Sequence, residues 1–179
     1  MDTPTPSSTN ASPRPEDTQQ QPDVSSRPPT WERAIEMLSG WKENPGKRNA
    51  WKETREKWPD WKPNLSGADL QMKDLSEAAL AEANLFNANL CGTDLGSAWL
   101  SGASLRRADL SGACLRNSVL RRADLAAGNF REANLRWAHL EEADLGRASF
   151  HTADIYEAYL SGASLDDVRG LRLNGNDLR

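Results

Sequence analysis

One apolar residue returns at every fifth position between residues 63 and 165, without a slip. Leucine fills this position throughout, except where Phe130, Phe150 and Ile155 replace it. A second series of positions, two residues before each of these centres, is mostly alanine. The pattern therefore describes a five-residue unit in which one small and one large apolar residue are separated by outward polar positions.

A period of five fits neither a helix nor a flat strand. Five residues advance an α-helix by about 500°, so the leucines would wind around its whole surface. Side chains of a strand alternate between its faces, so successive leucines would point to opposite sides. A short repeat of fixed length predicts instead a coil that turns a corner in every unit and buries a side chain from each, as in β-solenoids.

The units Ala-Asp-Leu, Ala-Asn-Leu and Ser-Gly-Ala resemble those of pentapeptide-repeat proteins, over 21 consecutive units. The resemblance implies an all-β solenoid, namely a right-handed quadrilateral β-helix of about five coils, with four units in each coil and coils stacked at about 4.8 Å. In this fold the centre and the small residue two before it face inward. Because Phe130 and Phe150 are twenty residues apart, we expect their rings to stack directly.

Composition divides the chain into four parts. Residues 1–29 are rich in Pro, Ser, Thr and Gln with almost nothing apolar, which predicts a disordered tail. A tryptophan-rich helical cap is expected at residues 30–62, the β-helix at 63–168 and a short C-terminal cap or tail at 169–179. The last boundary follows from the five-residue pattern, which fails after Leu165.

Five of the seven tryptophans stand just before the first repeat. Apolar spacing predicts one helix there from Thr30 to a stop at Gly40 and another from Asn49 to Trp58, with a turn at 44–46 between them. The first coil of a solenoid exposes its apolar interior and a strand edge, so it needs a cap. A similar tryptophan-rich segment precedes the first coil in the resembling family. The alternative is a tryptophan-lined groove for a peptide or ligand.

One side of the predicted coil differs from the others in the residue just before each centre. Elsewhere this residue is mostly Asp, Asn or Ser, which suit tight corners. On the side centred on Leu80 and on every twentieth residue after it, this position holds Ala79, followed by Trp99, Val119, His139 and Tyr159. We expect the last four to form an outward ladder. This aromatic ladder is a candidate interaction surface, with self-association as its simplest role. The alternative is that its members only stack on one another.

A ring of arginines in the third coil is a second candidate contact for an acidic partner or phosphates, and includes Arg106, Arg107 and Arg116. Two further members, Arg121 and Arg122, fall twenty residues before Glu141 and Glu142. Opposite charges on neighbouring coils would neutralise much of that ring.

Chemistry-bearing motifs are absent from the sequence. The two histidines, His139 and His151, belong to no recognisable nucleophile motif, and no paired cysteines, metal-binding histidine spacing or phosphate-binding glycine loop occurs. We therefore expect no enzyme activity, no cofactor and no metal site. Without an apolar run long enough for a membrane span or a secretory signal, we expect a cytoplasmic protein with no membrane contact.

Two functions remain. The first is a rigid scaffold that binds another protein, with a homodimer as one form of it. The second, implied by the resemblance, is a DNA-mimicking modulator of a type II topoisomerase such as DNA gyrase, without direct binding of nucleic acid. Residues 63–165 hold 13 acidic and 9 basic side chains, a mild excess that the arginine ring interrupts. The sequence therefore favours the scaffold.

Overall fold

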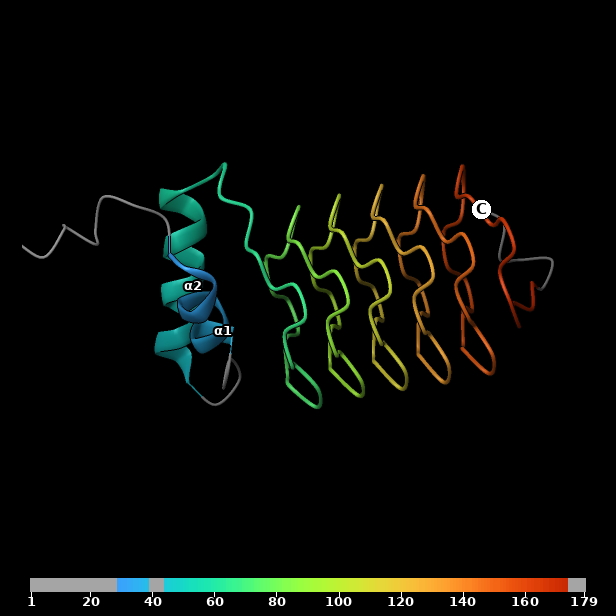
Figure 1. Cartoon of the computed structure of the whole chain (residues 1–179), viewed down its shortest axis with the longest axis horizontal. Helices are drawn as coiled ribbons and strands as arrows, with labels where there is room; N and C mark the ends of the chain where they lie inside the picture. The colour runs from blue at the N-terminus through green and yellow to red at the C-terminus, as the bar shows by residue number, and fades with distance from the viewer. Residues whose placement is uncertain (1–28, 39–43, 174–179) are drawn as a thin grey trace, which may run out of the picture.

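A computed structural model describes residues 29–38 and 44–173. Two helices, α1 (Trp31–Leu38) and α2 (Pro45–Lys57), lie at one end of a stack of coils that extends away from them towards the C-terminus (Figure 1). Apart from Pro29, the predicted disordered tail lies outside the described residues. In the part of the chain that is described, no helix has both the length and the apolar character needed to cross a membrane.

The coils are joined by parallel β-bridges of single residues. Every bridge within residues 44–173 connects two positions twenty residues apart, from Asn64–Asn84 to Ser149–Arg169. Each connected position stands directly before a centre, so a coil has four sides of one unit each. This confirms the coil of twenty residues. The first, second, third and fourth sides are centred on Leu65, Leu70, Leu75 and Leu80 and on the residues at multiples of twenty beyond them.

The inward positions form one continuous core. No centre from Leu65 to Leu160 is more than 6% exposed, and the small residues two positions earlier are mostly buried as well. The rings of Phe130 and Phe150 stack with centroids 4.8 Å apart and planes 6° from parallel, as predicted. Within the coil, burial of large side chains is thus confined to the inward positions, and the outward positions are free to vary.

Each corner has the same backbone geometry. The second residue after every centre from Leu65 to Leu165 has a positive φ, whether it is Gly102 at 66° or Arg122 at 57°. A side chain in this left-handed conformation costs roughly 1 kcal/mol. The short polar residue before many centres offsets the cost by accepting a backbone hydrogen bond, as Asp94 does from Gly96 N at 2.9 Å. The corners therefore tolerate many outward side chains.

Helix α2 starts four residues before the predicted position. Asn44 caps it, because its side-chain Oδ1 accepts hydrogen bonds from Gly46 N at 3.0 Å and Lys47 N at 3.3 Å, and Pro45 occupies the first helical position. The prediction of a turn at residues 44–46 was wrong, since Asn-Pro at this point begins the helix. Helix α1 follows Thr30, as expected.

Helix α2 covers the open interior of the first coil. Trp51 is fully buried, and its indole Nε1 donates a hydrogen bond to Ala79 O at 3.1 Å. Its ring also lies 5.5 Å from that of Trp61. Arg55 donates to Trp61 O and, at 3.2 Å, to Ala81 O. These contacts tie the helix to backbone that has no earlier coil to pair with.

The coil continues one unit beyond the point where the sequence pattern fails. Asp167 has the positive φ of a corner, at 57°, and Arg169 forms a bridge with Ser149. Backbone hydrogen bonds at 2.7 Å (Phe150 N to Arg169 O) and 2.9 Å (Arg169 N to Ala148 O) hold this last unit. The expectation that the pattern ends at Leu165 holds for side chains and not for the backbone, because these hydrogen bonds need no leucine.

Candidate interaction surface

The aromatic ladder forms one column on the fourth side. β-Bridges join Trp99 to Val119, Val119 to His139 and His139 to Tyr159. Trp99 is 61% exposed, and the other three are partly buried. The rings of His139 and Tyr159 stack with centroids 4.6 Å apart and planes 8° from parallel. The structure therefore brings the four predicted residues together, and their role in binding stays a prediction.

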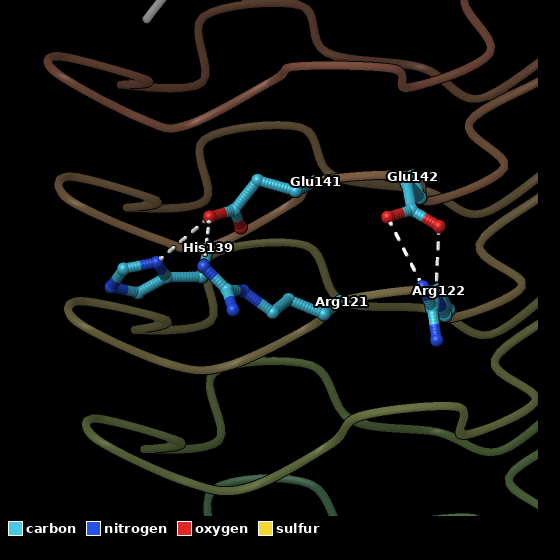
Figure 2. A network of polar contacts seen from close by, with 5 residues as sticks. All are labelled: Arg121, Arg122, His139, Glu141 and Glu142. Atoms are coloured by element: carbon cyan, nitrogen blue, oxygen red, sulfur yellow. Dashed lines mark hydrogen bonds and ion pairs between the residues drawn. The ribbon is translucent and has the colours of Figure 1, made fainter.

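Beside this ladder, at the corner between the fourth and first sides, two rows of opposite charge meet. Arg121 Nη2 lies 2.6 Å from Glu141 Oε1, and Arg122 Nε lies 2.8 Å from Glu142 Oε2 (Figure 2). Both pairs join positions twenty residues apart, as the sequence predicted. We refer to these four residues as the arginine–glutamate corner. It borders a shallow hollow of about 920 Å³.

His139 links the ladder to the arginine–glutamate corner. Its Nδ1 lies 3.3 Å from Glu141 Oε1, the same oxygen that Arg121 contacts (Figure 2). Burial raises the pKa of Glu141, but hydrogen bonds from Arg121, from its own backbone and from His139 outweigh burial and leave the pKa below its ordinary value. The hydrogen bond from Arg122 likewise lowers the pKa of Glu142. Both carboxylates are therefore charged at neutral pH.

The three other predicted arginines do not form one surface. Arg106 and Arg107 lie at the corner between the first and second sides, away from the ladder, and Arg106 Nη1 is 3.6 Å from Asp124 Oδ2. Arg116 lies at the corner between the third and fourth sides, next to the ladder. Its guanidinium is 5.0 Å from the centroid of the Trp137 ring. Of the three, only Arg116 adjoins the aromatic ladder.

Sequence analysis missed an aromatic cluster at that same corner. The guanidinium of Arg136 lies 4.9 Å from the ring centroid of Trp137 and 4.4 Å from that of Tyr156. The two rings meet edge to face at 6.3 Å, and Trp137 Nε1 donates to Glu157 Oε2 at 2.9 Å. The positions of these residues in the twenty-residue register carry the signal. This signal lies at the two positions after each centre of the third side, where Arg116, Arg136 and Tyr156 share one column and Trp137 and Glu157 the next.

At the other end of the ladder, Trp99 borders a mostly apolar hollow of about 510 Å³ between α2 and the coil. Lys52, Pro59, Glu77 and Ala79 contribute to its walls. The tryptophan-lined groove that the sequence offered as an alternative to a cap stays a prediction. Trp51 reaches the wall of the hollow but is fully buried, so Trp99 provides the exposed ring.

Side chains with catalytic potential are separated. His139 belongs to the fourth side, whereas His151 lies at the end of the second side with its Nδ1 3.0 Å from Ser149 Oγ. In residues 29–38 and 44–173, no three His, Cys, Asp or Glu side chains are grouped to hold a metal ion.

The sequence matches the model of one protein family. The model of the family described as pentapeptide repeats matches eight copies, over residues 64–96, 83–122 and 128–167, which is more than half of the chain. No curated protein sequence matches the chain.

Several solved structures are similar to the chain. The pentapeptide repeat protein Rfr23 of the cyanobacterium Cyanothece 51142 is 36% identical, with 54% of this chain and 63% of that chain covered and a TM-score of 0.48. HetL of the cyanobacterium Nostoc sp. strain PCC 7120, involved in regulation of heterocyst differentiation, is 32% identical over 61% of this chain and 62% of its own, with a TM-score of 0.30. QnrB1, a plasmid-mediated fluoroquinolone resistance protein, is 25% identical over 53% and 58%, with a TM-score of 0.35. The chain therefore spans less than two thirds of the length of Rfr23 and of HetL.

Proposed function

Because the chain belongs to the pentapeptide repeat family, we propose that it is a non-enzymatic scaffold that binds another protein through the fourth side of its coil. The observation that carries the proposal is Trp99, which is 61% exposed at one end of a column of apolar and aromatic side chains. Tryptophan, tyrosine and arginine are the residues most enriched among those that dominate binding energy at protein interfaces. All three types occur on the fourth side or at its two corners.

The rigidity of the coil supports this function. Two backbone hydrogen bonds tie Val119 to the preceding coil, because its N donates to Ala98 O at 2.9 Å and its O accepts from Leu100 N at 2.7 Å. His139 is held to Ser118 O and Leu120 N in the same way and at the same distances. A surface that is already ordered loses little conformational entropy when a partner binds. The inward leucines keep this surface flat, because every coil has the same dimensions.

Two matched variants test the proposal. Trp99→Ser with Tyr159→Ser removes aromatic area from the fourth side, and Asn89→Ser with Asn129→Ser changes the equivalent positions of the second side. We expect proteins captured by the unaltered chain to be lost with the first variant and kept with the second, while both variants melt as cooperatively as the original. Identical captured proteins for both variants would contradict the proposal.

A second candidate function is a DNA-mimicking modulator of DNA gyrase. The excess of acidic side chains over residues 63–165, arranged on a narrow stack of coils, favours it. The arginine–glutamate corner weakens it, because ion pairs interrupt the negative surface at mid-length. A titration of the protein against the supercoiling activity of gyrase tests it. Inhibition at micromolar concentration would raise this candidate above the scaffold, and no effect at high concentration would remove it.

We also infer the finer organisation that the sequence predicted. It comprises a right-handed coil at 63–168, a helical cap at 30–62 and a C-terminal cap or tail at 169–179. The helices at one end of Figure 1 support the first boundary. A cytoplasmic location completes the proposal, and cell fractionation with an antibody to the chain tests it.

A further inference from the structure

The charged residues beside the fourth side are arranged symmetrically about one point of the coil. At the corner between the fourth and first sides, successive coils present two outward residues each. These rows are Ser101-Gly102, Arg121-Arg122, Glu141-Glu142 and Ser161-Gly162. Consider a half-turn about an axis that runs across the fourth side, between the arginine row and the glutamate row. This rotation exchanges the two charged rows. The same half-turn exchanges the two Ser-Gly rows, so the corner is complementary to an inverted copy of itself.

The aromatic ladder shares this centre. The half-turn exchanges Val119 with His139 and Trp99 with Tyr159, the two aromatic ends of the column. An isologous contact requires this property, since each residue on one copy must fit its symmetry mate on the other. Two columns with one common centre therefore match a twofold interface.

From this symmetry we propose that a second copy of the chain binds the fourth side, face to face and antiparallel. The twofold axis crosses that side between the third and fourth coils. The pairing rests on the proposed function, because it requires the fourth side to be an interaction surface. It names the partner that this surface fits.

The charged rows give the pairing its specificity. Arg121 and Arg122 of one copy lie opposite Glu141 and Glu142 of the other, so arginine and glutamate alternate both within each chain and across the interface. The side chains of Arg121, Arg122 and Glu142 are 57%, 75% and 58% exposed and can reach across. The flanking glycine rows leave room for them, in the hollow of about 920 Å³.

The opposite corner of the fourth side is compatible with this arrangement. The half-turn sets the row Arg116-Asn117 of one copy against the row Arg136-Trp137 of the other, so Arg116 meets Arg136 beside the Trp137 ring, which it already contacts within its own chain at 5.0 Å. Arg136 also lies there, and Asp154 neutralises it at 3.1 Å. A parallel pairing would instead bring Arg121 and Arg122 towards Arg116 of the second copy, and Glu141 and Glu142 towards Arg136. Only the antiparallel pairing sets the arginine row of each copy opposite the glutamate row of the other.

The size of the surface sets the strength of the pairing. Four rows spaced by about 4.8 Å extend over roughly 15 Å. The area that a contact of this length buries is less than the area of about 800 Å² per partner that is usual for a stable interface. We expect a reversible dimer with a dissociation constant above about 1 μM. The helices and the first coil lie outside the overlap and stay available for other contacts.

Charge reversal tests the pairing. R121E/R122E and E141R/E142R should each raise the dissociation constant of the homodimer by about tenfold or more, because like charges then face each other across the axis. An equal mixture of these two variants should form a heterodimer, since every opposed row again carries opposite charges. Sedimentation velocity of the full chain, over a range of concentration, measures both effects.

The chain offers a matched control. Arg106 and Arg107 begin the same pentapeptide, Arg-Arg-Ala-Asp-Leu, that Arg121 and Arg122 begin, but at a corner away from the fourth side. R106E/R107E makes the same change in net charge and should dimerise like the unaltered chain. The fourfold variant R121E/R122E/E141R/E142R keeps the intrachain ion pairs in reversed polarity. It should dimerise with itself and not with the unaltered chain.

The outcomes separate this pairing from the proposed function. An unaltered chain that stays monomeric at all concentrations, a mixture of the two reversed variants that stays monomeric, or equal loss in R106E/R107E would each overturn the pairing. Should the pairing fail while Trp99→Ser with Tyr159→Ser still loses its captured proteins, the scaffold function stands alone. Heterodimers from the mixture, with captured proteins unaffected by that variant, would support the pairing and contradict binding of another protein through this side.

Discussion

The second and fourth sides of the coil share one backbone and differ in what they present to solvent. On the second side, Asn89 Nδ2 donates to Asp69 Oδ1 at 3.1 Å and Asn129 Nδ2 donates to Asp109 Oδ1 at 2.9 Å, so neighbouring coils satisfy each other's polar groups. On the fourth side the equivalent positions hold the aromatic ladder, with Trp99 largely exposed. The second side satisfies its polar groups within the chain, and the fourth side leaves apolar surface exposed.

This difference separates the positions that determine stability from those that determine contacts. Both sides bury large apolar centres, which are leucine on the fourth side and leucine or phenylalanine on the second, and both are joined by parallel bridges, so replacing the outward residues leaves the core intact. Inward positions have no such freedom, since each is packed between two coils.

The largest effect is expected at an inward position of the second side. Leu110 is fully buried, so Leu110→Asp places a carboxylate in the apolar core and should cost more than about 4 kcal/mol of unfolding free energy. Arg107→Ala, an outward change three residues earlier, should alter it by less than about 0.5 kcal/mol. Urea denaturation measures both. Similar losses in the two variants would refute the assignment of inward positions.

The next effect concerns the end of the coil. Trp51→Ala removes a buried ring and its hydrogen bond to Ala79 O, and should cost about 3–5 kcal/mol. Because each coil contacts only its neighbours, the loss should be greatest at the first coil. Hydrogen exchange should therefore accelerate at residues 65–85 and remain slow at 125–145. Uniform acceleration would show that α2 does not act as a local cap.

Outward substitutions should separate the two sides. Asn129→Leu leaves the carboxylate of Asp109 without its amide donor and should cost about 1 kcal/mol. Val119→Asn, at the equivalent position of the fourth side, breaks no hydrogen bond of its side chain and should cost less than about 0.5 kcal/mol. Thermal melting compares them. A larger loss for Val119→Asn would indicate that the fourth side is also completed within the chain.

The smallest effect depends on pH. Arg121 and His139 hold the pKa of Glu141 below its ordinary value, so its charged form stabilises the fold above the ordinary pKa of a glutamate. That contribution disappears as the pH falls through the lowered pKa of the folded state. Glu141→Gln should therefore lose less stability than the unaltered chain on acidification from pH 5 to pH 3. Parallel melting curves of the two proteins would contradict this role for Glu141.

Much of the fold follows from periodicity alone. The twenty-residue register predicted the stacking of Phe130 on Phe150 and the pairing of Arg121 with Glu141, because a repeat with constant dimensions fixes which side chains become neighbours. The start of α2 was misplaced since Asn-Pro is compatible with both a turn and a capped helix. The predicted end of the β-helix at residue 168 lies beyond the last apolar centre, and the bridge of Arg169 with Ser149 depends on backbone hydrogen bonds, which leave no apolar pattern in the sequence.

The candidate surface was only partly predictable. The aromatic ladder appears when residues before each centre are compared by register, and the structure places it on one side. The cluster of Arg136, Trp137 and Tyr156 depends on side chains that bend around a corner, so its contacts need coordinates. The exposure of a side chain also needs coordinates, because the sequence pattern alone does not distinguish the exposed ring of Trp99 from the half-buried ring of Tyr159.

Hydroxyl-radical footprinting at low and high protein concentration tests most directly whether the fourth side is where the chain associates. Trp99 and Tyr159 report on that side, and Met72, which is 76% exposed at a corner of the second side, is the internal control. We predict that oxidation of Trp99 and Tyr159 slows as concentration rises while that of Met72 stays constant. Unchanged oxidation of Trp99 and Tyr159, or protection of Met72 in their place, would contradict the account.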